Sequence, residues 1–147
     1  MKRVLGIIAG VSLSGVVLLA QAENATHVQG YTIHHNAMTT DTLSPQVAKA
    51  YNIQRSKTRG LLNVSVIKDE AGSSGTAVKA KVKAMAINLT GQARNIDLRE
   101  VTDGDAIYYL ADFRVTNEET LDFKLEVKPD GSTNTYTASL RQQFFTQ

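Results

Sequence analysis

The stretch Gly104-Asp105-Ala106-Ile107-Tyr108-Tyr109-Leu110-Ala111-Asp112-Phe113-Arg114-Val115 is the longest apolar run of the chain outside its N-terminal segment. Side chains alternate between the two faces of a β-strand. One face of this stretch is therefore apolar throughout, and the other is apolar as far as Leu110. Such a pattern is typical of a strand in the interior of a sheet. We predict a central antiparallel strand here.

The next run, residues 121–128, alternates apolar and charged side chains and follows a polar loop over residues 116–120. A hairpin with Phe113 opposite Phe123 aligns the two apolar faces and places Arg114 opposite Asp122 on the outer side. A shift of one residue would set apolar side chains against charges throughout, so the pattern specifies this register. We predict this hairpin.

A second hairpin is predicted on the other side of the central strand. The residues Thr102-Asp103-Gly104-Asp105 tolerate the tight dihedral angles of a turn. A four-residue loop pairs residues 94–101 with the central strand, placing Leu98 opposite Tyr109 and Ile96 opposite Ala111. The three strands then form a meander.

Residues 1–22 have the three parts of a signal peptide. Lys2 and Arg3 form the charged region, residues 4–20 are apolar, and Ala20-Gln21-Ala22 is a small-x-small cleavage motif. We predict cleavage after Ala22, which leaves residues 23–147 as a single β-sandwich domain in the periplasm. The alternative is an uncleaved membrane anchor, for which the apolar region barely reaches spanning length.

The composition excludes several classes of protein. The chain has no cysteine, so it has no disulfide, no thiolate nucleophile and no cysteine-ligated zinc. All 14 acidic residues lie beyond residue 22, with 14 of the 16 Lys and Arg, so residues 23–147 carry a formal charge of zero. A neutral domain gives no electrostatic reason to expect nucleic-acid binding. We expect no stable membrane insertion after cleavage, and the sequence leaves the oligomeric state open.

Further strands are predicted from alternating runs separated by turn residues, with residues 23–28 as a loose lead-in. In the run over residues 76–89, lysines occupy one face until Met85, after which that face is apolar. Either the strand crosses from solvent to a covered region or it carries a bulge. These strands are residues 30–37, 61–68, 76–89 and 135–145.

A two-turn helix is predicted between the first two of these strands. Ser44 can cap its N-terminus, and Pro45 suits the first helical position, where no amide donor is needed. Val47, Ala48 and Tyr51 share a face at helical spacing. We expect the helix Pro45–Tyr51 to plug one end of the fold.

Together the elements predict an all-β, immunoglobulin-like antiparallel sandwich of about seven strands with one short helix between the first two. The number of strands and the regular spacing of turn residues favour this class over others. The disulfide and the tryptophan of immunoglobulin domains are absent, so the strand order stays open.

The order and spacing of several segments resemble a proteobacterial family of small exported proteins, catalogued as domain of unknown function 4426. The resemblance covers nearly all of residues 23–147. It implies periplasmic residence in a Gram-negative bacterium and one β-rich domain, and it brings no activity, cofactor or catalytic residue. The segments that carry it are Tyr31-Thr32-Ile33-His34-His35-Asn36-Ala37, Leu43-Ser44-Pro45-Gln46-Val47-Ala48, Tyr51-Asn52-Ile53, Arg55-Ser56-Lys57, Asn63-Val64-Ser65-Val66, Asn88-Leu89-Thr90-Gly91-Gln92, Arg99-Glu100-Val101 and Gly104-Asp105-Ala106-Ile107-Tyr108-Tyr109.

No catalytic or metal-binding constellation is evident. His34 and His35 are adjacent on a strand and point to opposite faces, so they cannot chelate one metal together, and His27 would need carboxylates from elsewhere. No histidine–carboxylate spacing suggests a triad. Asp103 and Asp105 lack the further ligands of a calcium loop and are interpreted as turn residues. We expect no cofactor and no metal.

Two basic segments could contact a partner. Arg55, Lys57 and Arg59 follow the predicted helix and are either a solvated connector or a docking loop. The ladder of Lys79, Lys81 and Lys83 is either edge protection, which we favour, or a contact for anionic lipid or lipopolysaccharide.

The sequence therefore favours a non-enzymatic binding or interaction module, with Arg55, Lys57 and Arg59 as the candidate interaction surface and an envelope protein as its partner. The alternative is a small-ligand carrier or enzyme with a pocket beneath residues 44–59. A closed apolar pocket lined by Tyr31, Tyr51 and Tyr108 favours a ligand, whereas a solid core with an uncovered strand edge favours a protein partner.

Overall fold

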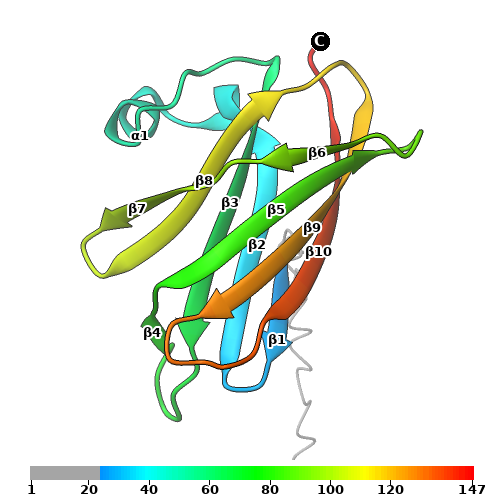
Figure 1. Cartoon of the computed structure of the whole chain (residues 1–147). Helices are drawn as coiled ribbons and strands as arrows, with labels where there is room; N and C mark the ends of the chain where they lie inside the picture. Colours follow the sequence, from blue (N-terminus) through cyan, green and yellow to red (C-terminus); the bar gives the residue numbers. More distant parts are fainter. Residues whose placement is uncertain (1–23) are drawn as a thin grey trace, which may run out of the picture.

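The computed structural model describes residues 24–147, which form two antiparallel β-sheets packed face to face (Figure 1). The predicted signal peptide, residues 1–22, lies outside the described residues. The strands are β1 (Ala25–Val28), β2 (Tyr31–Thr39), β3 (Arg59–Lys68), β4 (Thr76–Ala77), β5 (Ala80–Asn88), β6 (Ala93–Ile96), β7 (Arg99–Asp103), β8 (Ala106–Arg114), β9 (Glu119–Pro129) and β10 (Tyr136–Phe144). A 3-10 turn, η1 (Thr40–Thr42), and a helix, α1 (Pro45–Ala50), lie between β2 and β3.

The strand order confirms the predicted fold class. The first sheet has the order β1-β2-β3-β8-β7, with β4 on β3, and the second has the order β10-β9-β5-β6. Strands β2, β3, β8 and β7 are neighbours in the order of strands A, B, E and D of an immunoglobulin sandwich. Strands β5, β9 and β10 are neighbours in the order of its strands C, F and G. The described residues contain ten strands because β1 was predicted as a loose lead-in and two predicted strands are each divided between the sheets.

One divided strand is the lysine-bearing run over residues 76–89. Its first residues, β4, pair with β3, and the rest, β5, pairs with β9 and β6 in the other sheet. The chain therefore changes sheets at Val78 and Lys79. The outer side of β5 stays in solvent where it turns apolar, because Met85 is 38% exposed.

The predicted meander is wrong, because β8 and β9 lie in different sheets. Phe113 and Phe123 do meet, but they face each other across the interior with ring centroids 5.5 Å apart. Asp122 is opposite Arg141 of β10, and Arg114 is opposite Arg59 of β3. An alternating pattern shows which side chains point inward and does not show whether two strands are neighbours in one sheet or partners across the core.

The strand predicted over residues 94–101 is the second divided strand. Ile96 pairs with Ala84 in the second sheet, and β7 pairs with β8 in the first. Glu100, and not Leu98, is opposite Tyr109. The turn is also tighter than predicted, since Asp103 pairs with Ala106.

The main core lies between the sheets and includes an aromatic cluster. Phe113, Phe123 and Phe144 come from three strands, and their ring centroids lie 5.5 to 6.4 Å apart. Gly60 of β3 is opposite Phe113, and a Cβ atom there would lie 2.4 Å from the Phe113 ring. The glycine therefore makes room for the ring.

Helix α1 forms as predicted, with the Ser44 hydroxyl accepting from the Val47 amide at 3.2 Å. It does not plug an end of the sandwich. It covers part of the outer face of the first sheet, where it completes a second small core (Figure 1). The helix packs there because β2, β3 and β8 carry apolar side chains on this outer face. The buried residues of the second core are Ala48, Ile53, Leu61 and Leu110.

Candidate binding surface

A groove lies beside β2 and is here called the edge groove. It has a volume of about 1350 Å³ and is open to solvent. It runs over the outer side of β2 and β3 and reaches the end of β10. Figure 1 shows β1 beside the first part of β2, and the end of β10 reaches the groove beside the part of β2 that extends beyond β1. The groove is lined by Asn24, residues 34–39, Thr42, Asn63, Ser65, Ile67, Ser74, Gly75 and residues 142–145.

The edge groove exists because β1 is much shorter than β2. Strand β1 pairs with residues 31–34 of β2, and one further bond joins the His35 amide to the Asn24 carbonyl at 2.8 Å. Backbone groups of alternate residues point to the same side of an antiparallel strand. The amide and carbonyl of Ala37 therefore point to the open side, where no described strand pairs with them.

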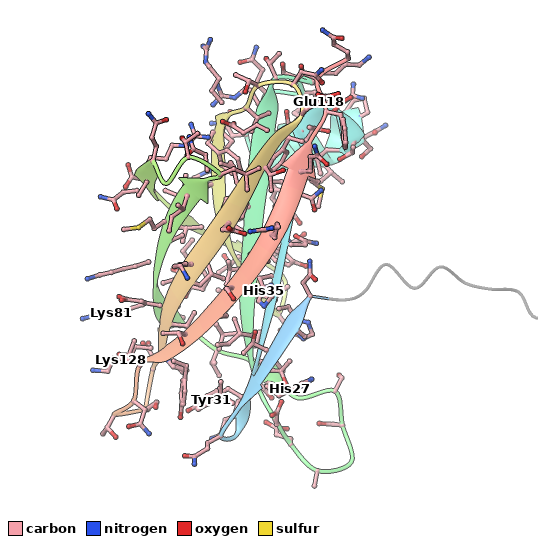
Figure 2. The ribbon with its side chains drawn as sticks, turned by 90° about the vertical axis from the view of Figure 1, so that its right-hand side faces the viewer. His27, Tyr31, His35, Lys81, Glu118 and Lys128 are labelled. Carbon is pink, nitrogen blue, oxygen red and sulfur yellow. The ribbon has the colours of Figure 1, made fainter. Side chains whose placement is uncertain are left out.

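His35 stands where the covered part of β2 ends (Figure 2). It is 5% exposed, and its Nε2 lies 2.9 Å from the Thr26 hydroxyl of β1. Burial lowers the pKa of His35 below its ordinary value of 6.5, because a buried imidazolium is poorly solvated. Its Nδ1 and the Oδ1 of Asn63 are buried and have no hydrogen-bond partner within residues 24–147. Both residues line the edge groove.

Sequence reasoning missed this surface because residues 23–28 were interpreted as a loose lead-in. No residue type in this segment marks where β1 stops, so the sequence carries no signal for the free edge, which appears only where the four residues of β1 lie beside the nine of β2.

The basic segment predicted from the sequence follows α1 and ends at Arg59, the first residue of β3. The Arg55 guanidinium donates to the carbonyl oxygens of Leu43 at 2.7 Å and Asp41 at 3.0 Å. Arg59 forms a salt bridge with Asp112 of β8. Lys57 is exposed and forms no salt bridge within residues 24–147. Two of the three cations therefore hold the segment in place, and contact with a partner stays a prediction.

The space beneath residues 44–59 is filled by the second core. Tyr51 and Tyr108 pack edge to face with centroids 6.1 Å apart, whereas Tyr31 packs against Tyr136 elsewhere in the fold. The three tyrosines therefore do not line one pocket. The Tyr51 hydroxyl donates to Asp103 at 2.8 Å, and this bond raises the pKa of Tyr51.

The histidines take part in hydrogen bonds at β1 and β2. His27 Nδ1 lies 3.1 Å from the Thr32 hydroxyl, which donates to Asp69 at 2.7 Å. Residues 24–147 contain no group of three or more His, Asp or Glu side chains placed to hold a metal ion. Over the same range, no helix is long and apolar enough to cross a bilayer.

Residues 25–147 match the model of a protein family described as domain of unknown function DUF4426. The chain belongs to this family. The crystal structure of a DUF4426 protein from Pseudomonas aeruginosa PAO1 is 31% identical in sequence, with a TM-score of 0.72 over 87% of this chain and 98% of that one. The predicted family is thereby confirmed.

Two structures of FetP from uropathogenic Escherichia coli strain F11 share the fold of this DUF4426 protein at 10% identity. One was expressed recombinantly in the periplasm of E. coli and has a TM-score of 0.60 over 84% of this chain and 93% of its own. The other, a copper-bound variant, has a TM-score of 0.59 over 86% and 97%. No curated protein matches the chain.

Proposed function

We propose that this DUF4426 protein is a periplasmic, non-enzymatic binding module that receives an extended segment of an envelope protein along the free edge of β2. The observation that carries the proposal is the open side of β2 beyond β1, where the amide and carbonyl of Ala37 have no described strand partner inside the edge groove. A free strand edge recognises extended peptides by forming main-chain hydrogen bonds with them.

The shape and lining of the edge groove favour a peptide over a small molecule. Its volume of about 1350 Å³ exceeds the roughly 300–1,000 Å³ of small-molecule pockets, and it is open to solvent. Asn36 and Asn63 supply polar contacts, and Met38 and Phe145 supply apolar ones. Phe145 is 58% exposed, so it is available to cover a bound strand.

The extended segment bound in the edge groove is more readily supplied by a partner protein than by this chain. Cleavage after Ala22 would leave Glu23 as the only residue before Asn24, which is too short to fill the groove. The periplasmic location rests on the signal-peptide pattern and on what the family resemblance implies. Within this proposal, Lys57 is the member of the basic segment that stays available for a second contact with the partner.

The experiment is site-specific photocrosslinking in intact cells, with the probe replacing Asn36 in the edge groove. The matched control replaces Thr137, which is exposed on β10 and lies outside the groove. We expect a discrete protein adduct from Asn36 and none from Thr137, with mass spectrometry locating the adduct in an extended segment of the partner. Equal labelling from both positions, or no protein adduct from Asn36, would contradict the proposal.

A further inference from the structure

Four exposed lysines form a cluster on the outer face of the second sheet, here called the lysine patch. Lys81 and Lys83 belong to β5, and Lys124 and Lys128 belong to β9. The register places Lys81 directly opposite Lys128 and Lys83 opposite Glu126. Figure 2 shows Lys81 and Lys128 projecting to the same side of the sandwich, away from α1.

The charge of the lysine patch is not balanced locally. None of its four ammonium groups forms a salt bridge with any residue from 24 to 147. With Glu126 included, the patch has a formal charge of +3, whereas residues 23–147 together have zero. Like charges directly opposite each other on neighbouring strands are destabilising. The fold therefore retains an unfavourable Lys81–Lys128 pair on a face that stays in solvent.

Edge protection explains only half of the lysine patch. Strand β6 pairs with residues 84–87 of β5, so Lys81 and Lys83 do border an open edge. Lys124 and Lys128 lie on β9, which is paired with β5 on one side and β10 on the other. An interior strand has no edge to protect. The cluster as a whole therefore needs another explanation.

The same face becomes apolar beyond the lysines. Met85 follows Lys83 on the outer side of β5 and is 38% exposed, and Leu89 at the end of the strand is 69% exposed. Basic side chains beside exposed apolar ones are typical of protein surfaces that lie on anionic membranes. Lysine also suits diffuse lipid phosphates, since its flexible stem carries a compact charge without a fixed geometry.

We propose that the lysine patch is a docking surface for an anionic phospholipid bilayer, with the outer face of the second sheet lying on the headgroups. This inference is independent of the edge groove, which opens at β2 in the other sheet. Docking through β5 and β9 would leave the edge groove free for a protein partner.

The test is co-sedimentation of the exported protein with vesicles of phosphatidylcholine alone or of phosphatidylcholine and phosphatidylglycerol in equal parts. We expect binding only to the anionic vesicles, and weaker binding as salt is added. The double variant Lys81→Gln with Lys128→Gln should bind about 25-fold less well, since each lysine near an anionic surface contributes about fivefold. Its melting temperature should not fall, because the change removes a like-charge pair.

The matched control is Lys49→Gln with Lys57→Gln, which removes the same charge from exposed positions on α1 and the segment after it. It should bind anionic vesicles as the unmodified protein does. Equal loss in both double variants would show that only net charge matters and would overturn the proposal. Failure to sediment with the phosphatidylglycerol vesicles would overturn it as well.

Discussion

The interior between the sheets and the edge of β2 are built from the same strands but differ in how completely they are closed. In the interior, inward side chains from both sheets fill the space, and the hydroxyl of Tyr109 accepts from the Ala80 amide at 2.8 Å and donates to Glu100 at 3.1 Å. At the edge, β2 continues beyond β1, and the amide and carbonyl of Ala37 face the open side, where no described strand pairs with them. Stability therefore depends on the interior, and the edge is available for binding.

The largest loss of stability should come from a substitution in the aromatic cluster of the interior. Phe123 is fully buried, so Phe123→Ala should lower the free energy of unfolding by about 3–5 kcal/mol, through lost burial and the cavity left behind. Denaturant unfolding measures this loss, with the exposed Thr137→Ala as control. A change as small as that of the control would contradict the position of Phe123 at the centre of the core.

The variant Gly60→Ala tests the packing of the interior by adding a Cβ atom. Gly60→Ala should destabilise the protein by about 1–3 kcal/mol, because the new Cβ would meet the rings of Phe113 and Phe144. Thermal unfolding measures the effect. Gly91→Ala is a control for the loss of a glycine without a clash, since nothing lies within 4 Å of a Cβ there, although its φ of 85° adds strain. A neutral effect of Gly60→Ala would contradict the close approach of the Phe113 and Phe144 rings to Gly60.

The inward pattern of side chains could be predicted from the sequence, and the pairing of strands could not. Leu62, Val64 and Val66 point inward as an alternating run predicts. The Ser44 and Pro45 signals located the helix, since capping is a local interaction. The β8–β9 meander failed because a polar loop can reverse the chain within a sheet or carry it across the sandwich, and both arrangements bury Phe113 against Phe123.

The candidate site was less predictable than the fold. Arg55 is evident in the sequence as a cation, but in the fold its guanidinium donates to the Leu43 and Asp41 carbonyls. A free edge depends on where a neighbouring strand stops, and no residue type marks that point. Half of the lysine patch could be predicted from the sequence, because Lys81 and Lys83 alternate along one strand. Lys124 and Lys128 join them only through the pairing of β5 with β9.

The free energy of unfolding should depend on pH through His35, which stands where the covered part of β2 ends. Because the pKa of His35 is lowered by folding, the folded state binds fewer protons than the unfolded state as the pH falls below 6.5. The contribution of neutral His35 is therefore fully present above that value and is lost as the pH falls towards the folded pKa. The physical cause is that protonation places a charge on a ring that burial keeps from water.

Denaturant unfolding between neutral and mildly acidic pH measures this dependence. The variant His35→Gln should show a smaller decrease in stability with falling pH than the unmodified protein. The control Thr137→Gln, at an exposed position, should leave the decrease unchanged. An identical pH dependence in all three proteins would show that His35 does not control it.

The smallest effect on stability should come from the edge itself. Asn36 is exposed, so Asn36→Lys should change the free energy of unfolding by no more than about 0.5 kcal/mol. A lysine on a free edge discourages strand pairing, so the same variant should lose the partner found by crosslinking, with the probe then placed at Gln143. Retention of the partner with a lysine at this position would place binding elsewhere.

The most direct test of a free β2 edge is amide hydrogen exchange in the isolated protein, resolved by residue with NMR. The amides of Asn36 and Met38 point towards β3 and should exchange slowly, whereas the amide of Ala37 points to the open side and should exchange many times faster. Protection of Ala37 equal to that of its two neighbours would show that the edge is already paired, and the proposed binding site would not exist.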